Sequence, residues 1–207
     1  MQAGQDITMT GATLAALSEN GSMILSAGHN LTMDTDSLEA RKDMTENSDN
    51  YIRTYRKTET ANTLAAGKTI TLAAGENLRA RNTTVFSENG QITAAAKGDV
   101  NLENGYNESR DDYGLKYKER GLLSSKTTTI KSLDESKTVT ASTLSGDAVQ
   151  ITAGGNTNMT GSQVIGTHDV AISSGKDTSI SSAQEYERHD YAKQVKKSGL
   201  LSGGGLG

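Results

Sequence analysis

A short phrase recurs along the chain and constrains its fold more than any other feature. The phrase is Gly, a polar residue and Asn or Asp, followed by alternating apolar and polar residues. Clear copies occupy residues 4–9, 28–33, 75–78 and 175–180. Alternation with a period of two is typical of a short strand with one buried face. Gly with Asn or Asp suits the tight corner before it. Each copy therefore predicts one corner and one strand.

The spacing of the copies indicates how the strands stack. Equivalent strands begin 21 to 24 residues apart, as between Ile7 and Leu31 and between Leu78 and Val100. This interval is typical of one turn of a three-sided solenoid with short strands. Such a fold buries a thin core one coil at a time. The sequence therefore predicts an all-β, three-sided parallel β-solenoid of about five coils.

Three stacked faces follow from this register. The first face is expected to stack Ile7, Leu31, Leu78, Val100, Thr157 and Thr178. The third face is expected to stack Ile24, Ile70, Ile92, Val149 and Val170. The second face is expected only on alternate turns, at Leu14, Val85 and Val164. On the other turns, a long insert is expected to replace it.

Three inserts interrupt the repeat, approximately at residues 34–63, 103–146 and 181–207. They contain all seven Tyr residues and clusters of charge. Their β-branched and aromatic content favours long β-hairpins that leave the solenoid from one side on alternate coils. Neighbouring hairpins can then pair into an outer sheet. Disordered loops are the alternative, which the polarity of the inserts also allows.

The inserts hold the candidate interaction surface. Tyr beside Arg and Lys is typical of contact surfaces, and Gly-Leu-Leu-Ser occurs in two inserts, at residues 121–124 and 199–202. Such tips can enter a membrane or drive self-association, but the default expectation is that their leucines pack back on the solenoid or on the next hairpin. The candidate residues are Tyr51, Arg53, Tyr55, Tyr113, Tyr117, Leu122, Leu123, Tyr186, Tyr191, Leu200 and Leu201.

Composition argues against other classes of protein. Aromatic residues are 4% of the chain, and there is no Trp, so an ordinary globular core is not expected. Pro and Cys are absent, which suits continuous sheet and excludes disulfides, thiolate metal sites and cysteine nucleophiles. No long apolar run predicts a membrane-spanning helix. The formal net charge of −4, with acids and bases interleaved, argues against nucleic-acid binding.

No catalytic, metal or cofactor site is predicted. His29 and His168 occupy polar corner positions, and His189 lies between Arg188 and Asp190 in an insert, so all three are expected to face solvent. A polysaccharide-cleaving enzyme is the rival interpretation, since many parallel β-helices are lyases or glycosidases. Such an enzyme needs a cleft with convergent acids or bases. Here the acids are scattered, so we expect no enzyme activity.

The phrases at Gly4, Gly28, Gly75 and Gly175, together with the segment 196–207, resemble haemagglutinin repeats. These repeats occur in filamentous haemagglutinin and in CdiA-type exoproteins of contact-dependent growth inhibition. The resemblance covers nearly the whole chain. It implies a right-handed parallel β-helix, secreted through the periplasm to the bacterial cell surface by an outer-membrane two-partner secretion transporter. It brings no catalytic residues.

The resemblance also implies a structural and interaction role. The expected role is toxin delivery to neighbouring bacteria, with the target-cell outer membrane or a surface receptor as partner. The alternative is an adhesin stalk or spacer that binds host or bacterial surfaces. The chain is expected to be a fragment of a longer protein, and its open solenoid ends are expected to favour end-to-end self-association.

Overall fold

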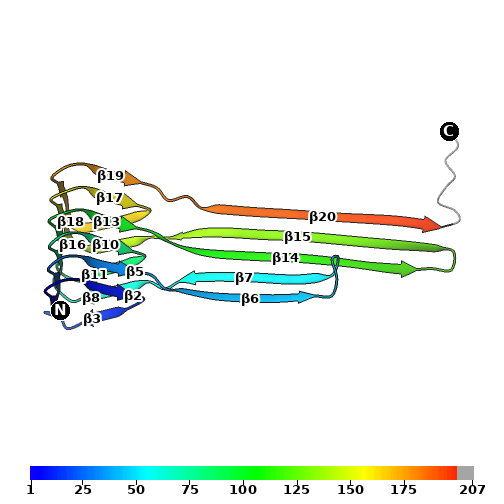
Figure 1. The fold of residues 1–207 in the computed structure, drawn as a ribbon, viewed down its shortest axis with the longest axis horizontal. Helices are drawn as coiled ribbons and strands as arrows, with labels where there is room; N and C mark the ends of the chain where they lie inside the picture. The colour runs from blue at the N-terminus through cyan, green and yellow to red at the C-terminus, as the bar shows by residue number, and fades with distance from the viewer. Residues whose placement is uncertain (200–207) are drawn as a thin grey trace. The chain divides into compact units, whose positions relative to one another are not determined.

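The computed structural model describes residues 1–199. These residues form β-strands and no helix (Figure 1), and so include no helix long and apolar enough to cross a membrane. The chain divides into two compact units. The first comprises Met1–Leu38, Thr58–Asn107 and Val139–Gln184. The second comprises Glu39–Lys57, Glu108–Thr138 and the segment that begins at Glu185.

The first unit is built from stacked parallel strands, as in a β-solenoid. One of its sheets has six strands, in the order β19 (Thr178–Ser181), β17 (Thr157–Thr160), β13 (Val100–Glu103), β10 (Leu78–Arg81), β5 (Leu31–Asp34) and β2 (Ile7–Thr10). Its register pairs Ile7 with Leu31 and Leu78 with Val100, and Thr157 lies between Val100 and Thr178. The predicted first face is therefore confirmed at every position.

A second sheet of nine strands supplies the other two faces. Its path is β1 (Gln2–Ala3), β4 (Met23–Ala27), β9 (Ile70–Ala74), β12 (Gln91–Ala96), β16 (Ser142–Ala153), β11 (Thr83–Ser87), β8 (Asn62–Ala66) and β3 (Thr13–Ala16). The ninth strand, β18 (Ser162–Ser174), pairs with β16. β16 and β18 each pass through both faces, with a register shift after Gly146.

The second face is present on every turn that the described strands complete, which corrects the prediction that inserts replace it on alternate turns. Leu14 pairs with Leu64, and Val85 pairs with both Leu64 and Leu144. Leu64 and Leu144 are fully buried. The excursions of the chain therefore occur between a first-face strand and the next second-face strand. They interrupt a corner and leave all three faces intact.

The third face is confirmed from Ile70 onward and is wrong by one residue at Ile24. Met23, not Ile24, is the partner of Ile70. Ile24 is 52% exposed, whereas Leu25 is 1% exposed. Three apolar residues stand in a row here, so the pattern alone fits either register. Stacking of Leu25 on Leu72 decides between them.

The core of the first unit is thin and continuous. Large side chains that are fully buried include Leu31, Leu64, Leu78, Ile92 and Leu102. Each lies directly over an equivalent residue of the neighbouring coil, so the same inward position repeats along the stack. Removing water from one such side chain is worth about 1.5–3 kcal/mol. The stability of each coil therefore depends on the coils on either side of it.

Polar side chains line one corner of the stack. The backbone N–H of Asn30 donates to Asp6 Oδ1 at 2.9 Å, and that of Asp99 donates to Asn77 Oδ1 at 2.9 Å. Successive coils approach closely beside this ladder, since a Cβ added to Gly75 would lie 1.8 Å from the carbonyl oxygen of Gly28. The ladder runs through Asp6, Asn30, Asn77, Asp99, Asn156 and Asp177.

The second unit is a five-stranded sheet. Its order is β20 (Tyr186–Gly199), β15 (Ser124–Thr140), β14 (Gly105–Arg120), β7 (Tyr51–Glu59) and β6 (Ser37–Thr45). β14 pairs with β7, and β15 with β20, in antiparallel fashion. Three segments that are distant in sequence therefore form one sheet.

Candidate interaction surface

The candidate interaction residues within the described chain gather in the five-stranded sheet and at one of its turns. β7 carries three of them, β14 two and β20 two, whereas Leu122 and Leu123 lie in the connection between β14 and β15. Leu200 and Leu201 lie outside the described residues. The structure therefore assembles one surface from residues that are up to 140 positions apart, from Tyr51 to Tyr191.

The described leucine pair is exposed. Leu122 is 101% exposed and Leu123 64% exposed, so the default expectation that this pair packs against the solenoid or another hairpin is wrong. The connection closes where the N–H of Gly121 donates to the carbonyl oxygen of Ser124 at 2.8 Å. The two leucines lie between Gly121 and Ser124, within the turn that this bond closes.

Cross-strand pairing assigns the other residues to two faces. Tyr55 is paired with Arg110, and Ile52 with Tyr113. Directly opposite residues share a face, and neighbours along a strand alternate. Arg110 Nη1 also contacts Glu135 Oε1 at 3.1 Å, which places Glu135 on the face of Tyr55. We call this side the charged face and the side of Ile52 and Tyr113 the apolar face, although the latter also carries the ion pair of Arg56 with Asp111.

An Arg-x-Asp triplet recurs on the charged face. It occurs at Arg41–Asp43 in β6, at Arg110–Asp112 in β14 and at Arg188–Asp190 in β20. The sequence analysis missed this repeat. The signal was the interval of 78 residues from Arg110 to Arg188, which equals the interval from Gly121 to Gly199 in the Gly-Leu-Leu-Ser phrase.

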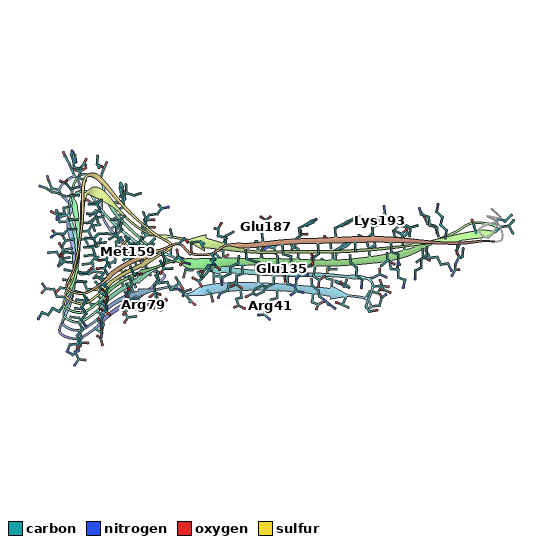
Figure 2. All side chains as sticks on the ribbon, turned by 90° about the horizontal axis from the view of Figure 1, so that it is seen from above. Arg41, Arg79, Glu135, Met159, Glu187 and Lys193 are labelled. Atoms are coloured by element: carbon teal, nitrogen blue, oxygen red, sulfur yellow. The ribbon has the colours of Figure 1, made fainter. Side chains whose placement is uncertain are left out.

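The arginines of the triplets form one row across the sheet. The guanidinium of Arg41 lies over the ring of Tyr55, 4.9 Å from its centroid, and Tyr55 is paired with Arg110. Glu135 continues the row, 3.1 Å from Arg110 and 3.9 Å from Arg188. Figure 2 shows Arg41 and Glu135 on separate strands of this sheet. Tyr and Glu thus occupy equivalent places between successive arginines.

The aspartates of the triplets form the next row. Asp43 contacts Arg53 Nε at 3.4 Å, and Arg53 is paired with Asp112. The third member, Asp190, forms an ion pair with Arg188. The pairs of Asp43 with Arg53 and of Asp190 with Arg188 are well exposed, so each stabilises the sheet by only about 0–1 kcal/mol. Their regular placement determines the register more than the stability of the sheet.

Tyr51 packs against a glycine of the neighbouring strand on the charged face. Its ring lies across Gly114, where an added Cβ would be 2.5 Å from Tyr51 Cε1. The guanidinium of Arg53 lies 4.6 Å from the ring centroid. Burial raises the pKa of the Tyr51 hydroxyl, and its hydrogen bond to Asp112 raises it further. Gly114 is therefore the place where this aromatic ring can lie flat against the sheet.

The apolar face carries the other aromatic candidates. Ser109 and Ser136 share a hydrogen bond of 2.8 Å on this face, which extends the face assignment to β15 and, through its register, to β20. Tyr191 is 60% exposed and Tyr117 41% exposed, and Met44, Ile52, Tyr113 and Val195 lie on the same side. The candidate tyrosines are thus divided: Tyr51, Tyr55 and Tyr186 lie on the charged face, and Tyr113, Tyr117 and Tyr191 on the apolar face.

The three histidines lie at exposed positions. His29 and His168 occupy corners of the first unit. His189 Nδ1 is hydrogen-bonded to Asp134 across β15 and β20, and this bond, together with the negative charge of Asp134, raises the pKa of the imidazole. Among residues 1–199, no group of three or more His, Asp or Glu residues is arranged to hold a metal ion.

Comparison with known proteins identifies the class of repeat. A family model described as hemagglutinin repeat matches residues 43–199. The chain is 30% identical over 213 residues to tRNA nuclease CdiA-2 of Burkholderia pseudomallei, which covers 98% of this chain and 7% of that protein. It is 32% identical over 149 residues to 16S rRNA endonuclease CdiA of Enterobacter cloacae, which covers 70% of this chain and 4% of the relative.

These relatives are much longer than the chain. It spans 16% of a further relative, tRNA nuclease CdiA of Burkholderia pseudomallei, at 30% identity over 211 residues. No solved structure matches the chain. The family model covers more than half of the residues and includes both the stacked strands and the five-stranded sheet. The chain therefore belongs to the hemagglutinin repeat family.

Proposed function

We propose that the chain is a structural and interaction segment of a secreted filamentous exoprotein that delivers a toxin to neighbouring bacteria. The similarity to CdiA proteins over 98% of the chain carries this proposal. The matched proteins are named as nucleases that act on tRNA or 16S rRNA. The chain is a small part of their length. We therefore assign it the role of presenting and positioning the toxin, and we assign the nuclease activity to another part of such a protein.

The proposed architecture is a right-handed parallel β-helix of about five coils. The excursions that contain β6 with β7 and β14 with β15 are hairpins, and they leave the stack on alternate coils. Parallel stacking of six strands in register supports the helix. The positions of β6 beside β7 and of β14 beside β15 in the five-stranded sheet support the hairpins. A fold of this kind can carry a broad contact surface, because each coil is stabilised by contacts with its neighbouring coils alone.

The proposed site of action is the target-cell outer membrane or a receptor on it. The exposed Leu122–Leu123 pair supports this, because exposed apolar groups beyond a sheet are suited to enter a lipid surface. The apolar face, with Ile52 and Tyr191 exposed beside Tyr113, supplies a second contact area. Tyr side chains suit a membrane interface, where one end is apolar and the other is wet.

Secretion and localisation follow from the same proposal. The chain would cross the periplasm, pass an outer-membrane two-partner secretion transporter and function at the bacterial cell surface. A chain without Cys has no thiols to form disulfides in an oxidising compartment. We propose no enzymatic activity, cofactor or nucleic-acid partner for this segment. An adhesin stalk is the alternative function, and the Tyr and Arg residues of the charged face favour it as a binding surface.

Flotation with outer-membrane vesicles tests the delivery role. The 207-residue chain should float with vesicles, and the Leu122→Asp/Leu123→Asp variant should remain in the dense fraction. A second variant, Ile52→Asp/Tyr191→Asp, measures the contribution of the apolar face. If the unaltered chain does not associate with vesicles, the membrane role is wrong and an adhesive stalk is the better assignment.

Matched controls separate binding from folding. Leu122 and Leu123 are exposed, so their replacement should change the free energy of unfolding by no more than about 0.5 kcal/mol. Asn47→Asp/Ser48→Asp, at exposed positions in the turn between β6 and β7, introduces the same two carboxylates without removing apolar surface. This control variant should float as well as the unaltered chain.

A further inference from the structure

The row of arginines contains two equivalent intervals that are filled differently. Between Arg110 and Arg188 lies Glu135, whose two carboxylate oxygens face one arginine each, at 3.1 and 3.9 Å. Between Arg41 and Arg110 lies Tyr55. The first interval therefore contains an internal anion that bridges two guanidiniums, and the second contains a neutral ring.

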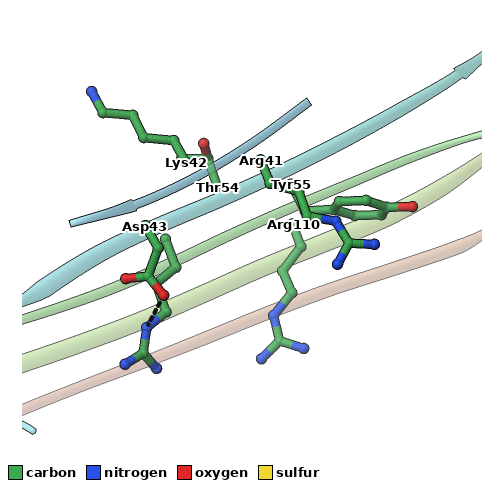
Figure 3. Close-up of a pocket in the computed structure, with 7 residues that line it drawn as sticks. Arg41, Lys42, Asp43, Thr54, Tyr55 and Arg110 are labelled. Carbon is green, nitrogen blue, oxygen red and sulfur yellow. Dashed lines mark ion pairs between the residues drawn. The ribbon is translucent and has the colours of Figure 1, made fainter. Parts of the chain in front are cut away.

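The surface of the sheet has a hollow beside Tyr55. A hollow of about 350 Å³ lies beside Arg41, Arg53, Tyr55 and Arg110. Figure 3 shows the side chains of Arg41, Tyr55 and Arg110 beside the hollow, with the Arg41 guanidinium next to the Tyr55 ring. Asp43 is the one acid that lines this hollow among the described residues, and it is engaged by Arg53 at 3.4 Å.

The neighbouring acids leave part of each arginine available. Glu39 contacts Arg41 from the same strand at 3.2 Å, and both side chains are well exposed. Glu135 and Asp112 contact Arg110 at 3.1 and 3.6 Å. A guanidinium has five N–H donors in a planar fork, so these contacts do not use all of its donors. The ring of Tyr55 restrains Arg41 by a cation–π contact. The Arg41 side chain therefore loses less conformational freedom when a ligand binds.

We propose that Arg41 and Arg110, with Arg53 beside them, form a binding site for a phosphate monoester. The group would bridge Arg41 and Arg110 as Glu135 bridges Arg110 and Arg188. A phosphate monoester suits this site because its dianion offers three oxygens to planar arginine forks. The proposal goes beyond the delivery role and does not depend on it, since an adhesive stalk would use the same site.

Titration of the 207-residue chain with glucose 6-phosphate, followed by calorimetry, tests the site. Tyr55→Glu places a carboxylate between Arg41 and Arg110, as Glu135 does in the next interval, and should displace the ligand. Arg41→Gln removes one of the two guanidiniums that would hold the phosphate. Either change should weaken binding roughly ten- to a hundredfold, the range for loss of charge-assisted hydrogen bonds. Tyr55→Phe keeps the ring and should bind as the unaltered chain does.

Arg188→Gln is the matched control, because this arginine occupies the same row beside an internal acid. It should leave the affinity for glucose 6-phosphate unchanged, and all variants should keep the same circular dichroism spectrum. If Arg188→Gln and Arg41→Gln lower the affinity equally, general charge attraction explains the binding and the proposed site is wrong. Unchanged binding by Tyr55→Glu would also overturn it.

A second arm identifies the source of the phosphate. Vesicles of phosphatidylcholine with phosphatidic acid present the same monoester as a lipid headgroup, and pure phosphatidylcholine vesicles are the control. Binding to the phosphatidic acid vesicles that is lost in Arg41→Gln assigns a headgroup site, and binding to the sugar phosphate alone assigns a soluble or polysaccharide ligand. Absence of binding in both arms contradicts the proposal. The vesicle test of Leu122 and Leu123 is separate, so either idea can fail alone.

Discussion

Arg81 Nη2 donates to both carboxylate oxygens of Glu59, at 2.7 and 2.9 Å, in the stacked unit. The Glu59 side chain is 4% exposed and that of Arg81 25%. Glu59 also accepts the backbone N–H of Tyr106 at 3.1 Å. One carboxylate thus holds together the end of β7, the end of β10 and the start of β14.

Replacing Glu59 with Ala should destabilise the stacked unit. It leaves the Arg81 guanidinium partly buried without this partner and removes the carboxylate that accepts the N–H of Tyr106. We expect a loss of about 2–4 kcal/mol, toward the lower end of the range for breaking a buried pair because Arg81 is a quarter exposed. Urea unfolding measures the change. The Glu59→Ala/Arg81→Met double variant should lose less than the two single changes added together, and strict additivity would show that the pair does not interact.

Neighbouring substitutions in β4 test the register of the third face. Leu25 is 1% exposed and Ile24 52% exposed. Leu25→Asp buries an unpaired carboxylate and should lower the free energy of unfolding by more than about 4 kcal/mol. Ile24→Asp places the same group in solvent and should change it by no more than about 0.5 kcal/mol. Thermal unfolding of both variants tests the register. If Ile24→Asp is the more destabilising change, Ile24 is the partner of Ile70, as the sequence pattern predicts.

Substitutions in the middle of the stack should affect several coils together. Leu78 pairs with Leu31 on one side and Val100 on the other, and all three are fully buried. Leu78→Asp should therefore lower amide-exchange protection in β5 and β13 as well as in β10, because each coil depends on its neighbours. Loss of protection confined to β10 would mean that the coils fold independently.

The packing of Tyr51 on Gly114 predicts a coupled pair of substitutions. Gly114→Ala puts a Cβ 2.5 Å from Tyr51 Cε1, so the ring must move away. We expect a loss of about 1 kcal/mol and a change in the near-ultraviolet circular dichroism of tyrosine. In a Tyr51→Ala background, the same Gly114→Ala change should cost less. An equal cost in both backgrounds would exclude the contact as its cause.

The His189–Asp134 pair predicts a dependence on pH within the five-stranded sheet. The pKa of His189 is raised above its ordinary value of 6.5. The folded sheet therefore holds this proton more tightly than the unfolded chain does. The stabilisation is fully present below pH 6.5 and is lost as the pH rises through the folded pKa. NMR titration should show a His189 pKa that falls in Asp134→Asn, and an unchanged value would remove Asp134 as the cause.

The sequence predicts the first face completely because Gly and Asn or Asp mark each corner before the strand. Ile7, Leu31 and Leu78 can therefore be aligned without knowledge of the fold. Leu64 and Leu144 have no such marker, since each follows a long excursion of the chain, so the pattern does not predict a second-face strand on their turns. The prediction for Ile24 is wrong for a different reason. Its neighbours on both sides are apolar, so two registers fit the pattern equally well until Leu72 is placed beside Leu25.

The candidate surface is predicted in its residues but not in its geometry. Tyr content and charge identify the strands of the second unit. Which tyrosines share a face depends on register between segments such as β7 and β14, and no local pattern specifies this. Tyr55 and Tyr113 are both candidates, yet they point to opposite sides of the sheet. The Arg-x-Asp repeat would have revealed the register, because equivalent triplets must lie side by side.

The corner ladder has a direction. At each step, the side-chain oxygen belongs to the earlier coil and the backbone N–H to the later one, from Asp6 and Asn30 through to Asn156 and Asp177. A coil that forms after its predecessor therefore always finds the acceptor already in place. The two ends of the stack therefore differ: an exposed column end at the C-terminal side offers side-chain acceptors, and one at the N-terminal side offers backbone donors.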